Sequence, residues 1–221
     1  MSPPVDRPGR RGRLVVLRHG LTAHNAAGIW QGHLDSPLNE AGMAQARKVA
    51  PVIAQYEPAV LFSSDLRRAR DTASAVHDAL PHLEVRVDPR YREIDVGQWQ
   101  GLTTDEMLER FPEAPDQLAT GEDFRRGGDG ETFAELGTRA LAATTDLLHD
   151  LPDGATAVVV THGVTARALT GGLLGLDRAT AWTTLSGLGN CHWAELGLYG
   201  GQWRLHGWNL RAQFGARPPA G

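Results

Sequence analysis

Cysteine is almost absent from this sequence of 221 residues, in which Cys191 is the only one. No disulfide can form within the chain, so a reducing compartment is expected, for which the cytoplasm is the simplest choice. Residues 189–193 look like the start of a strand. We therefore interpret Cys191 as a small buried side chain and not as a nucleophile.

Long apolar runs are also missing. No stretch of 18 or more apolar residues is present, which excludes a transmembrane helix and predicts no membrane partner. Residues 1–13 carry prolines and charges without an apolar segment, so they do not form a secretory signal. We expect residues 1–12 to be a disordered leader.

An excess of basic charge is lacking too, because 22 Lys and Arg residues face 26 Asp and Glu residues, for a net charge of −4. Non-specific nucleic-acid binding needs a basic surface, so no nucleic-acid partner is expected. The sequence holds no His-x-x-x-His, no Cys-x-x-Cys and no Gly-x-x-x-x-Gly-Lys loop. We therefore expect no bound metal, and no nucleoside triphosphatase of the kind that uses such a loop.

What is present is an alternation of apolar strands with helical segments, which predicts an α/β fold. We expect a three-layer αβα sandwich whose central sheet is mainly parallel with an antiparallel edge. One domain over residues 13–215 is the simplest division at this length. The insert at about 102–130 is too long for a plain connector, so a lid or specificity element is expected there. The predicted strands are 14–17, 59–62, 84–87 and 155–160, with a final hairpin of 191–198 and 202–208.

Helix starts can be located because Asn, Asp and Thr side chains accept hydrogen bonds from the first helical turn. The expected caps are Asn39, Asp65, Thr103 and Thr132, for helices at about 40–55, 65–80, 104 onward and 133–151. One more helix follows the strand at 155–160 and reaches about residue 174.

Arginine and histidine side chains follow the predicted strands at the points where these strands end. Arg18 and His19 follow the first strand, and His162 follows a later one. Ligands bind at the carboxyl ends of strands in open α/β sheets. Arg68 lies near the start of a predicted helix, where backbone N–H groups and a guanidinium both favour anions. These positions predict an anion site.

Each of these residues also has a structural interpretation. A single histidine at a strand end is often structural, and Glu93 alone would be a surface carboxylate in a glycine-punctuated loop. Binding of a metal by His19 and His162 is disfavoured because the adjacent Arg18 would repel a cation. Gly20 is expected to let the backbone turn sharply and approach a ligand closely.

Four motifs, in order, resemble the signature of the histidine phosphatase superfamily, the phosphoglycerate mutase-like proteins. They are Arg-His-Gly-x-Thr-x-x-Asn at 18–25, Arg-Ala-x-x-Thr-Ala at 68–73, Glu-x-x-x-Gly-x-x-x-Gly at 93–101 and Thr-His-Gly at 161–163. The resemblance implies a phosphoglycerate mutase-like fold in which His19 becomes phosphorylated, Glu93 donates a proton and no cofactor is needed. For phosphate and substrate binding it implies Arg18, Arg68, His162, Asn25, Thr22, Gln31, Gly32 and Gly163.

The resemblance leaves more than one reaction open. A metal-independent phosphatase acting on a small phosphomonoester is expected, since Leu21-Thr22 stands where mutases of this family usually have Glu-Ser. A cofactor-dependent phosphoglycerate mutase and a non-catalytic phosphate-binding module are the alternatives. Residues 187–190 and 203–209 resemble the glucosyl-3-phosphoglycerate phosphatase group, which suggests a phosphoglycerate-type or sugar phosphate substrate. The apolar, tryptophan-bearing C-terminal third is compatible with a homodimer.

Overall fold

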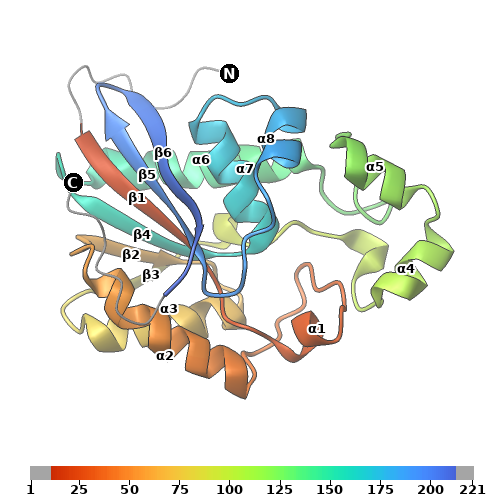
Figure 1. Ribbon diagram of the computed structural model, residues 1–221, viewed down its shortest axis with the longest axis horizontal. Helices are drawn as coiled ribbons and strands as arrows, with labels where there is room; N and C mark the ends of the chain where they lie inside the picture. Colours follow the sequence, from red (N-terminus) through yellow and green to blue (C-terminus); the bar gives the residue numbers. More distant parts are fainter. Residues whose placement is uncertain (1–10, 213–221) are drawn as a thin grey trace.

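The computed structural model describes residues 11–212 of the chain. Six strands form one sheet in the order β3-β2-β4-β1-β5-β6 (Figure 1). The first four strands in that order run parallel, and β5 and β6 add the antiparallel edge. The prediction of a mainly parallel sheet with such an edge is confirmed. The strands are β1 (Arg11–Arg18), β2 (Val60–Ser63), β3 (Val85–Val87), β4 (Thr156–Thr161), β5 (Trp193–Tyr199) and β6 (Gln202–Leu210).

The first strand starts earlier than the sequence indicated. Of the leader predicted at 1–12, residues 1–10 lie outside the described residues, whereas Arg11 and Gly12 belong to β1. These two residues pair with Tyr199 and Leu198 of β5. Backbone pairing with the neighbouring strand therefore sets the start of β1, and hydrophobicity alone does not reveal it.

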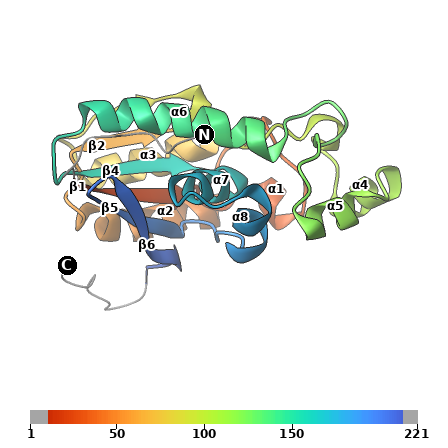
Figure 2. The ribbon, with the colours of Figure 1, turned by 90° about the horizontal axis from the view of Figure 1, so that it is seen from above.

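Helices cover both faces of the sheet and complete the predicted three layers. α2 and α3 pack on one face and α6 and α7 on the other, and Figure 2 shows α2 and α6 on opposite sides. The apolar run of β1 serves both cores, because successive side chains of a strand point to opposite faces. Leu14 and Val16 join the core beside α6 and α7, whereas Val15 and Leu17 join the core beside α2 and α3. Burial on both faces explains why this strand has no polar residue in its middle.

The helices and their bounds are as follows, with η marking 3₁₀ turns. They are α1 (Ala23–Ala26), α2 (Glu40–Ala54), α3 (Arg67–Ala79), η1 (Pro89–Tyr91), η2 (Gly97–Trp99), α4 (Thr104–Arg110), α5 (Ala114–Thr120), α6 (Phe133–Asp150), α7 (Gly163–Leu173) and α8 (Arg178–Thr184). Among residues 11–212, none of these helices is long and apolar enough to cross a membrane.

Three of the predicted helix caps are confirmed. The side chain of Asn39 accepts a hydrogen bond from the backbone N of Gly42 at 2.8 Å at the start of α2. Thr103 and Thr132 form complete capping boxes at the starts of α4 and α6. Each cap satisfies backbone N–H groups that have no partner within the helix.

The prediction that Asp65 caps the next helix is wrong. α3 begins at Arg67, its N-cap residue is Leu66, and the backbone N of Arg67 donates to Oδ1 of Asp35 at 2.5 Å. Asp65 instead accepts hydrogen bonds from Nε and Nη2 of Arg92 at 2.8 and 2.6 Å. A two-point ion pair is stronger than a cap bond to a neutral N–H, and these bonds lower the pKa of Asp65. The pair ties the end of β2 to the loop that carries Glu93.

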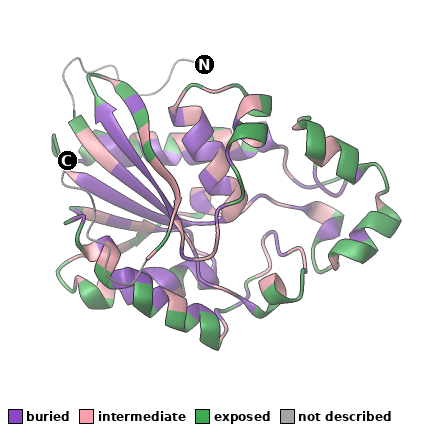
Figure 3. Ribbon diagram, viewed as in Figure 1, coloured by how far each residue is buried: buried purple, intermediate pink, exposed green. Residues whose placement is uncertain are grey.

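The insert at 102–130 contains two short helices, α4 and α5, of which the sequence predicted only the first. Both lie to one side of the sheet (Figure 1), and most of their surface is exposed (Figure 3). The insert contacts α8, a helix that was not predicted, where Trp182 Nε1 donates to the carbonyl of Leu118. A seven-residue helix has too few turns to show a clear hydrophobic period, which explains why α5 and α8 were missed.

Candidate active site

The carboxyl ends of β1 and β4 bring His19 and His162 side by side. These strands are parallel neighbours in which Arg18 pairs with Thr161, and the backbone N of His19 donates to the carbonyl of Thr161 at 2.9 Å. The two imidazole rings meet edge to face with centroids 5.0 Å apart. Both side chains are buried, with exposures of 3% for His19 and 0% for His162.

The imidazole of His19 is neutral and oriented. Its Nδ1 lies 2.7 Å from the carbonyl oxygen of Gly20, which only accepts, so Nδ1 carries the proton and Nε2 has a free lone pair. The pKa of His19 lies well below its ordinary value because of burial, with the charges of Arg68 and Arg18 adding to the effect. An unprotonated nitrogen is what a nucleophile requires.

Gly20 has a different role from the one expected. A Cβ at this position would lie 2.6 Å from the carbonyl oxygen of Gly42 in α2, and a Cβ at Gly42 would lie 2.0 Å from the carbonyl oxygen of Leu21. The two glycines therefore let the loop after β1 press against the first turn of α2. The expectation of close approach to a ligand at Gly20 is replaced by close approach to a helix.

Arg68 is held by backbone carbonyls and by a histidine. Its Nη1 and Nη2 donate to the carbonyls of Leu34 and Gly32 at 2.6 and 2.9 Å, and its Nε donates to Nδ1 of His162 at 3.2 Å. No carboxylate within residues 11–212 pairs with this guanidinium. Burial lowers the pKa of Arg68 to about 10, so it remains a cation at neutral pH.

His162 has the opposite tautomer to His19. Its Nδ1 accepts the bond from Arg68, so the proton is on Nε2, which donates to Oγ of Ser64 at 2.9 Å. The pKa of His162 lies well below its ordinary value, mainly because the side chain is buried and also because of the charge of Arg68. Sequence reasoning missed Ser64 as a partner of His162. Its place after β2, next to β4 in the sheet, was the signal that could have revealed it.

Arg18 contributes a second guanidinium to the site. Its Nη1 donates to the carbonyl of Leu188, and its Nε is buried without a partner in the described part of the chain. Gly163 is its neighbour, since a Cβ there would be in ordinary van der Waals contact with the guanidinium carbon at 3.6 Å. Gly163, expected to bind substrate, thus lies against Arg18.

Glu93 lies at the N-terminus of α7. Its carboxylate accepts hydrogen bonds from the backbone N of Val164 at 3.1 Å, the backbone N of Thr165 at 3.0 Å and the hydroxyl of Thr165 at 3.1 Å. Arg139 fixes its backbone by donating to its carbonyl at 2.8 Å, and Arg139 is paired with Glu131 at 2.7 Å. The carboxylate is thereby anchored one residue beyond the His162-Gly163 turn.

The remaining candidates divide into pocket residues and supporting residues. Asn25, Gln31 and Gly32 line the pocket. Thr22 is fully buried behind it, where its hydroxyl accepts from the backbone N of Asn25 at 3.0 Å and caps α1. Asn190, which sequence reasoning missed, donates to the carbonyl of His19 at 3.1 Å and to Asn25 at 3.3 Å.

A pocket of about 270 Å³ lies beside these side chains. His162 is fully buried against His19 and does not itself line the pocket. The lining includes the guanidiniums of Arg18 and Arg68 together with the carboxylate of Glu93, which suits a small anion with an attached alcohol. Among residues 11–212 no group of three or more His, Cys, Asp or Glu side chains could hold a metal ion. The lining residues are Arg18, His19, Asn25, Gly28, Ile29, Trp30, Gln31, Gly32, Arg68, Glu93, Ile94, Val96, Thr104 and Val164.

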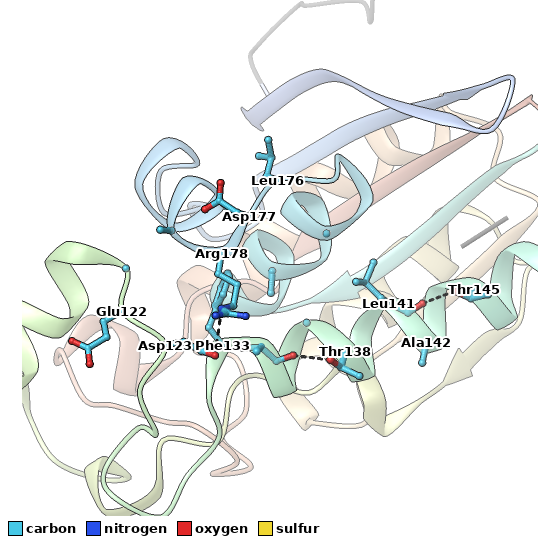
Figure 4. Close-up of a pocket in the computed structure, with 17 residues that line it drawn as sticks. Glu122, Asp123, Phe133, Thr138, Leu141, Ala142, Thr145, Leu176, Asp177 and Arg178 are labelled. Carbon is cyan, nitrogen blue, oxygen red and sulfur yellow. Dashed lines mark hydrogen bonds and ion pairs between the residues drawn. The ribbon is translucent and has the colours of Figure 1, made fainter. Parts of the chain in front are cut away.

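A larger cavity of about 760 Å³ lies elsewhere, between α6, α7, α8 and residues 121–123 (Figure 4). Its lining is mostly apolar and contains no histidine. Its one lining cation, Arg178, is paired with Asp123 at 3.4 Å (Figure 4). The cavity therefore lacks the groups that phosphate chemistry needs.

A neutral imidazole with an open Nε2 lies next to guanidiniums without carboxylate partners at the carboxyl ends of parallel strands, an arrangement suited to attack on a phosphate group. The model of the histidine phosphatase superfamily (branch 1) matches residues 14–211. The chain belongs to this superfamily, as its motifs predicted.

Similar proteins cover nearly the whole chain. The glucosyl-3-phosphoglycerate phosphatase of Mycolicibacterium vanbaalenii is 38% identical over 219 residues, which is 91% of this chain and 96% of that protein. A probable phosphoglycerate mutase of Yersinia pestis is 35% identical over 200 residues, covering 90% and 91%. A structure of a mycobacterial glucosyl-3-phosphoglycerate phosphatase in complex with VO3 has a TM-score of 0.84 and 38% identity, covering 89% of this chain and 98% of that one. The predicted phosphoglycerate mutase-like fold is confirmed.

Proposed function

We propose that the protein is a metal-independent phosphomonoester hydrolase that acts through a phosphohistidine at His19. The observation that carries this proposal is the hydrogen bond from Nδ1 of His19 to the carbonyl of Gly20, which leaves an unprotonated Nε2 in the pocket. Its substrate is a phosphoglycerate-type or sugar phosphate, as the names of the similar glucosyl-3-phosphoglycerate phosphatases suggest.

The first step forms the phosphohistidine. Nε2 of His19 attacks the phosphorus, the P–N bond forms, and the ester P–O bond breaks. The carboxyl group of Glu93 gives its proton to the departing alkoxide, which leaves as an alcohol. Glu93 is suited to this role because it lines the pocket and its backbone is fixed by Arg139.

The second step regenerates the enzyme. Water attacks the phosphorus, the Glu93 carboxylate takes the proton from that water, and the P–N bond breaks to release phosphate and neutral His19. In both steps Arg18 and Arg68 offset the charge on the phosphoryl oxygens, as positioned cations do in phosphoryl transfer. Asn25 and the Nε2–H of His162 supply further donors.

A phosphatase and a phosphoglycerate mutase would share this first step, since a probable mutase is among the similar proteins. We favour hydrolysis because of the Leu21-Thr22 pair and the similarity to named phosphatases. The test is ³¹P NMR of the protein incubated with 3-phosphoglycerate. The proposal expects inorganic phosphate, whereas accumulation of 2-phosphoglycerate without phosphate would establish a mutase. Binding without any turnover would establish the non-catalytic module.

Three further predictions belong to this proposal. The insert at 102–130 acts as a lid or specificity element, supported by its contact between Leu118 and Trp182 beside α7. The protein works in the cytoplasm, and it forms a homodimer, both of which rest on the sequence features given above.

A further inference from the structure

Arg167 is a cation that the proposed phosphate chemistry does not use. It lies on α7 and is largely covered, with its guanidinium carbon 4.3 Å from the centre of the Trp182 ring. Its Nε is buried without a hydrogen-bond partner, and no carboxylate among residues 11–212 forms an ion pair with it. A buried N–H such as that of Nε is unfavourable without an acceptor, because it loses water and gains nothing in return.

The position of Arg167 on α7 directs it toward the pocket. Residues three and four apart on a helix share one face, and Arg167 is three residues after Val164 and four after Gly163. Val164 lines the pocket, and Gly163 lies against Arg18. Long helical side chains also lean toward the helix N-terminus, which here is the pocket end.

Arg167 is not among the lining residues of the 270 Å³ pocket, but two observations relate its guanidinium to residues of that lining. A Cβ at Gly187 would lie 3.8 Å from Nη2 of Arg167, and the next residue, Leu188, accepts the hydrogen bond from Arg18. The carboxylate of Glu93 acts on the charge of Arg167 and opposes the lowering of its pKa by burial. Arg167 thus stands on the same side of the site as the proposed proton donor of the leaving alcohol.

We propose that Arg167 binds a carboxylate on the leaving alcohol and selects phosphate esters of hydroxy acids over esters of neutral alcohols. This inference rests on the proposed function and names the feature of the substrate that the site recognises. A guanidinium presents a planar pair of donors that matches a carboxylate. The Trp182 ring holds that plane in place before substrate arrives, which reduces the entropy lost on binding.

A second arginine, Arg126, also stacks on Trp182, so this stacking alone does not identify a residue that binds substrate. Its guanidinium lies 5.4 Å from the same ring and 3.8 Å from that of Phe124, and its Nη1 donates to the carbonyl of Phe124 at 3.1 Å. It is 3% exposed and belongs to the insert, and Glu93 is not among the charges that act on it. We therefore assign Arg126 to packing of the insert and Arg167 to the substrate.

The test compares two esters that differ at one group. 3-Phosphoglycerate and sn-glycerol 3-phosphate share the phosphorylated carbon and the neighbouring hydroxyl, but the first has a carboxylate where the second has a hydroxymethyl group. The measured quantity is the ratio of kcat/KM for the two esters on the same preparation, so any loss of folded protein cancels. The variants are Arg167→Met, which keeps the stem over Trp182, and Arg167→Lys, which keeps the charge. The matched control is Arg204→Met, an arginine 5.3 Å from the Tyr199 ring on β6.

We expect the wild type to favour 3-phosphoglycerate and Arg167→Met to lower the ratio roughly 10- to 100-fold, the range for a lost hydrogen-bonded charge. The ratio for Arg167→Lys should lie between those of the wild type and Arg167→Met. Arg204→Met should retain the wild-type ratio. An unchanged ratio in Arg167→Met, or no preference in the wild type, overturns the inference about Arg167 but leaves the proposed function standing. A wild type that hydrolyses neither ester nor p-nitrophenyl phosphate overturns the proposed function as well.

Discussion

His19 and His162 lie in edge-to-face contact, and their hydrogen bonds require opposite tautomers. In His19 the proton is on Nδ1, bound to a carbonyl, and the lone pair is on Nε2. In His162 the lone pair accepts from Arg68 and the proton is on Nε2. One ring is therefore prepared to attack an electrophile and the other to donate to an anion, although both follow a strand and precede a glycine.

Neutral buried histidines should make stability depend on pH. The pKa values of His19 and His162 are lowered in the folded protein, so as pH falls below about 6.5 the unfolded chain takes up protons that the folded chain does not. The free energy of unfolding should fall with decreasing pH in this range. Each such histidine contributes a slope of about 1.4 kcal/mol per pH unit.

Urea denaturation of His19→Gln between pH 7.5 and 5.5 isolates one of these contributions. We expect its slope to be smaller than that of the wild type by about half a proton averaged over this range, approaching one proton near pH 5.5. His149→Gln, at an exposed position beside Asp150, is the control and should keep the wild-type slope. Equal slopes for the wild type and His19→Gln would show that His19 is not held neutral by the fold.

Ser64 competes with a bound anion for the proton of His162. Replacing Ser64 with Ala removes the acceptor of Nε2–H, so inorganic phosphate should bind about 2- to 10-fold more tightly, the worth of one hydrogen bond. Titration calorimetry measures this. Ser63→Ala is the control, since Ser63 Oγ donates to the Ser64 carbonyl, whereas the partner of His162 Nε2 is the hydroxyl of Ser64. Weaker phosphate binding in Ser64→Ala would instead make the serine hydroxyl part of the phosphate site.

Glu93 should matter most when the leaving alcohol is poor. A glycerate alkoxide needs a proton in the transition state, whereas p-nitrophenolate is a stable anion. Glu93→Gln should therefore slow phosphorylation by 3-phosphoglycerate roughly 10²- to 10⁴-fold more than by p-nitrophenyl phosphate. Pre-steady-state bursts are required, because the same residue is proposed to activate water afterwards. Asp95→Asn, two residues along the loop, is the comparison, and equal losses for both esters in Glu93→Gln would move the acid role to Asp95.

Removal of divalent metals should leave activity intact. The cationic side chains of Arg18 and Arg68 line the pocket and can offset the phosphate charge in place of a metal. The measurement is hydrolysis of p-nitrophenyl phosphate before and after dialysis against EDTA. Loss of turnover that Mg²⁺ restores would refute the cationic-pocket mechanism.

The parts of this molecule that the sequence predicted depend on local signals. The apolar run 14–17 requires a strand buried on both faces, and the residues after it must then lie at the sheet edge. The same logic placed His162 beside His19, because parallel neighbours bring their carboxyl ends together. Asn39 and Thr132 were recognisable as caps because their partners lie within three residues.

The parts that sequence reasoning missed depend on contacts between distant segments. Asp65 had every local property of a cap, but Arg92 lies 27 residues away and forms the stronger bond. Gly20 resembled a ligand-approach residue until Gly42 was placed against it. In the sequence Arg167 looks like any other helical arginine. Only the structure shows that its Nε lacks a hydrogen-bond partner and that it lies one turn after Gly163 on α7.

The central claim is that His19 carries the phosphoryl group. The most direct measurement is rapid quenching of the enzyme into base during turnover of 3-phosphoglycerate, followed by mass spectrometry of its peptides. The account predicts phosphate on the imidazole of His19, lost on acid treatment, and no phosphopeptide in His19→Ala. Phosphate on Cys191 or on a serine, or continued turnover by His19→Ala, would contradict it.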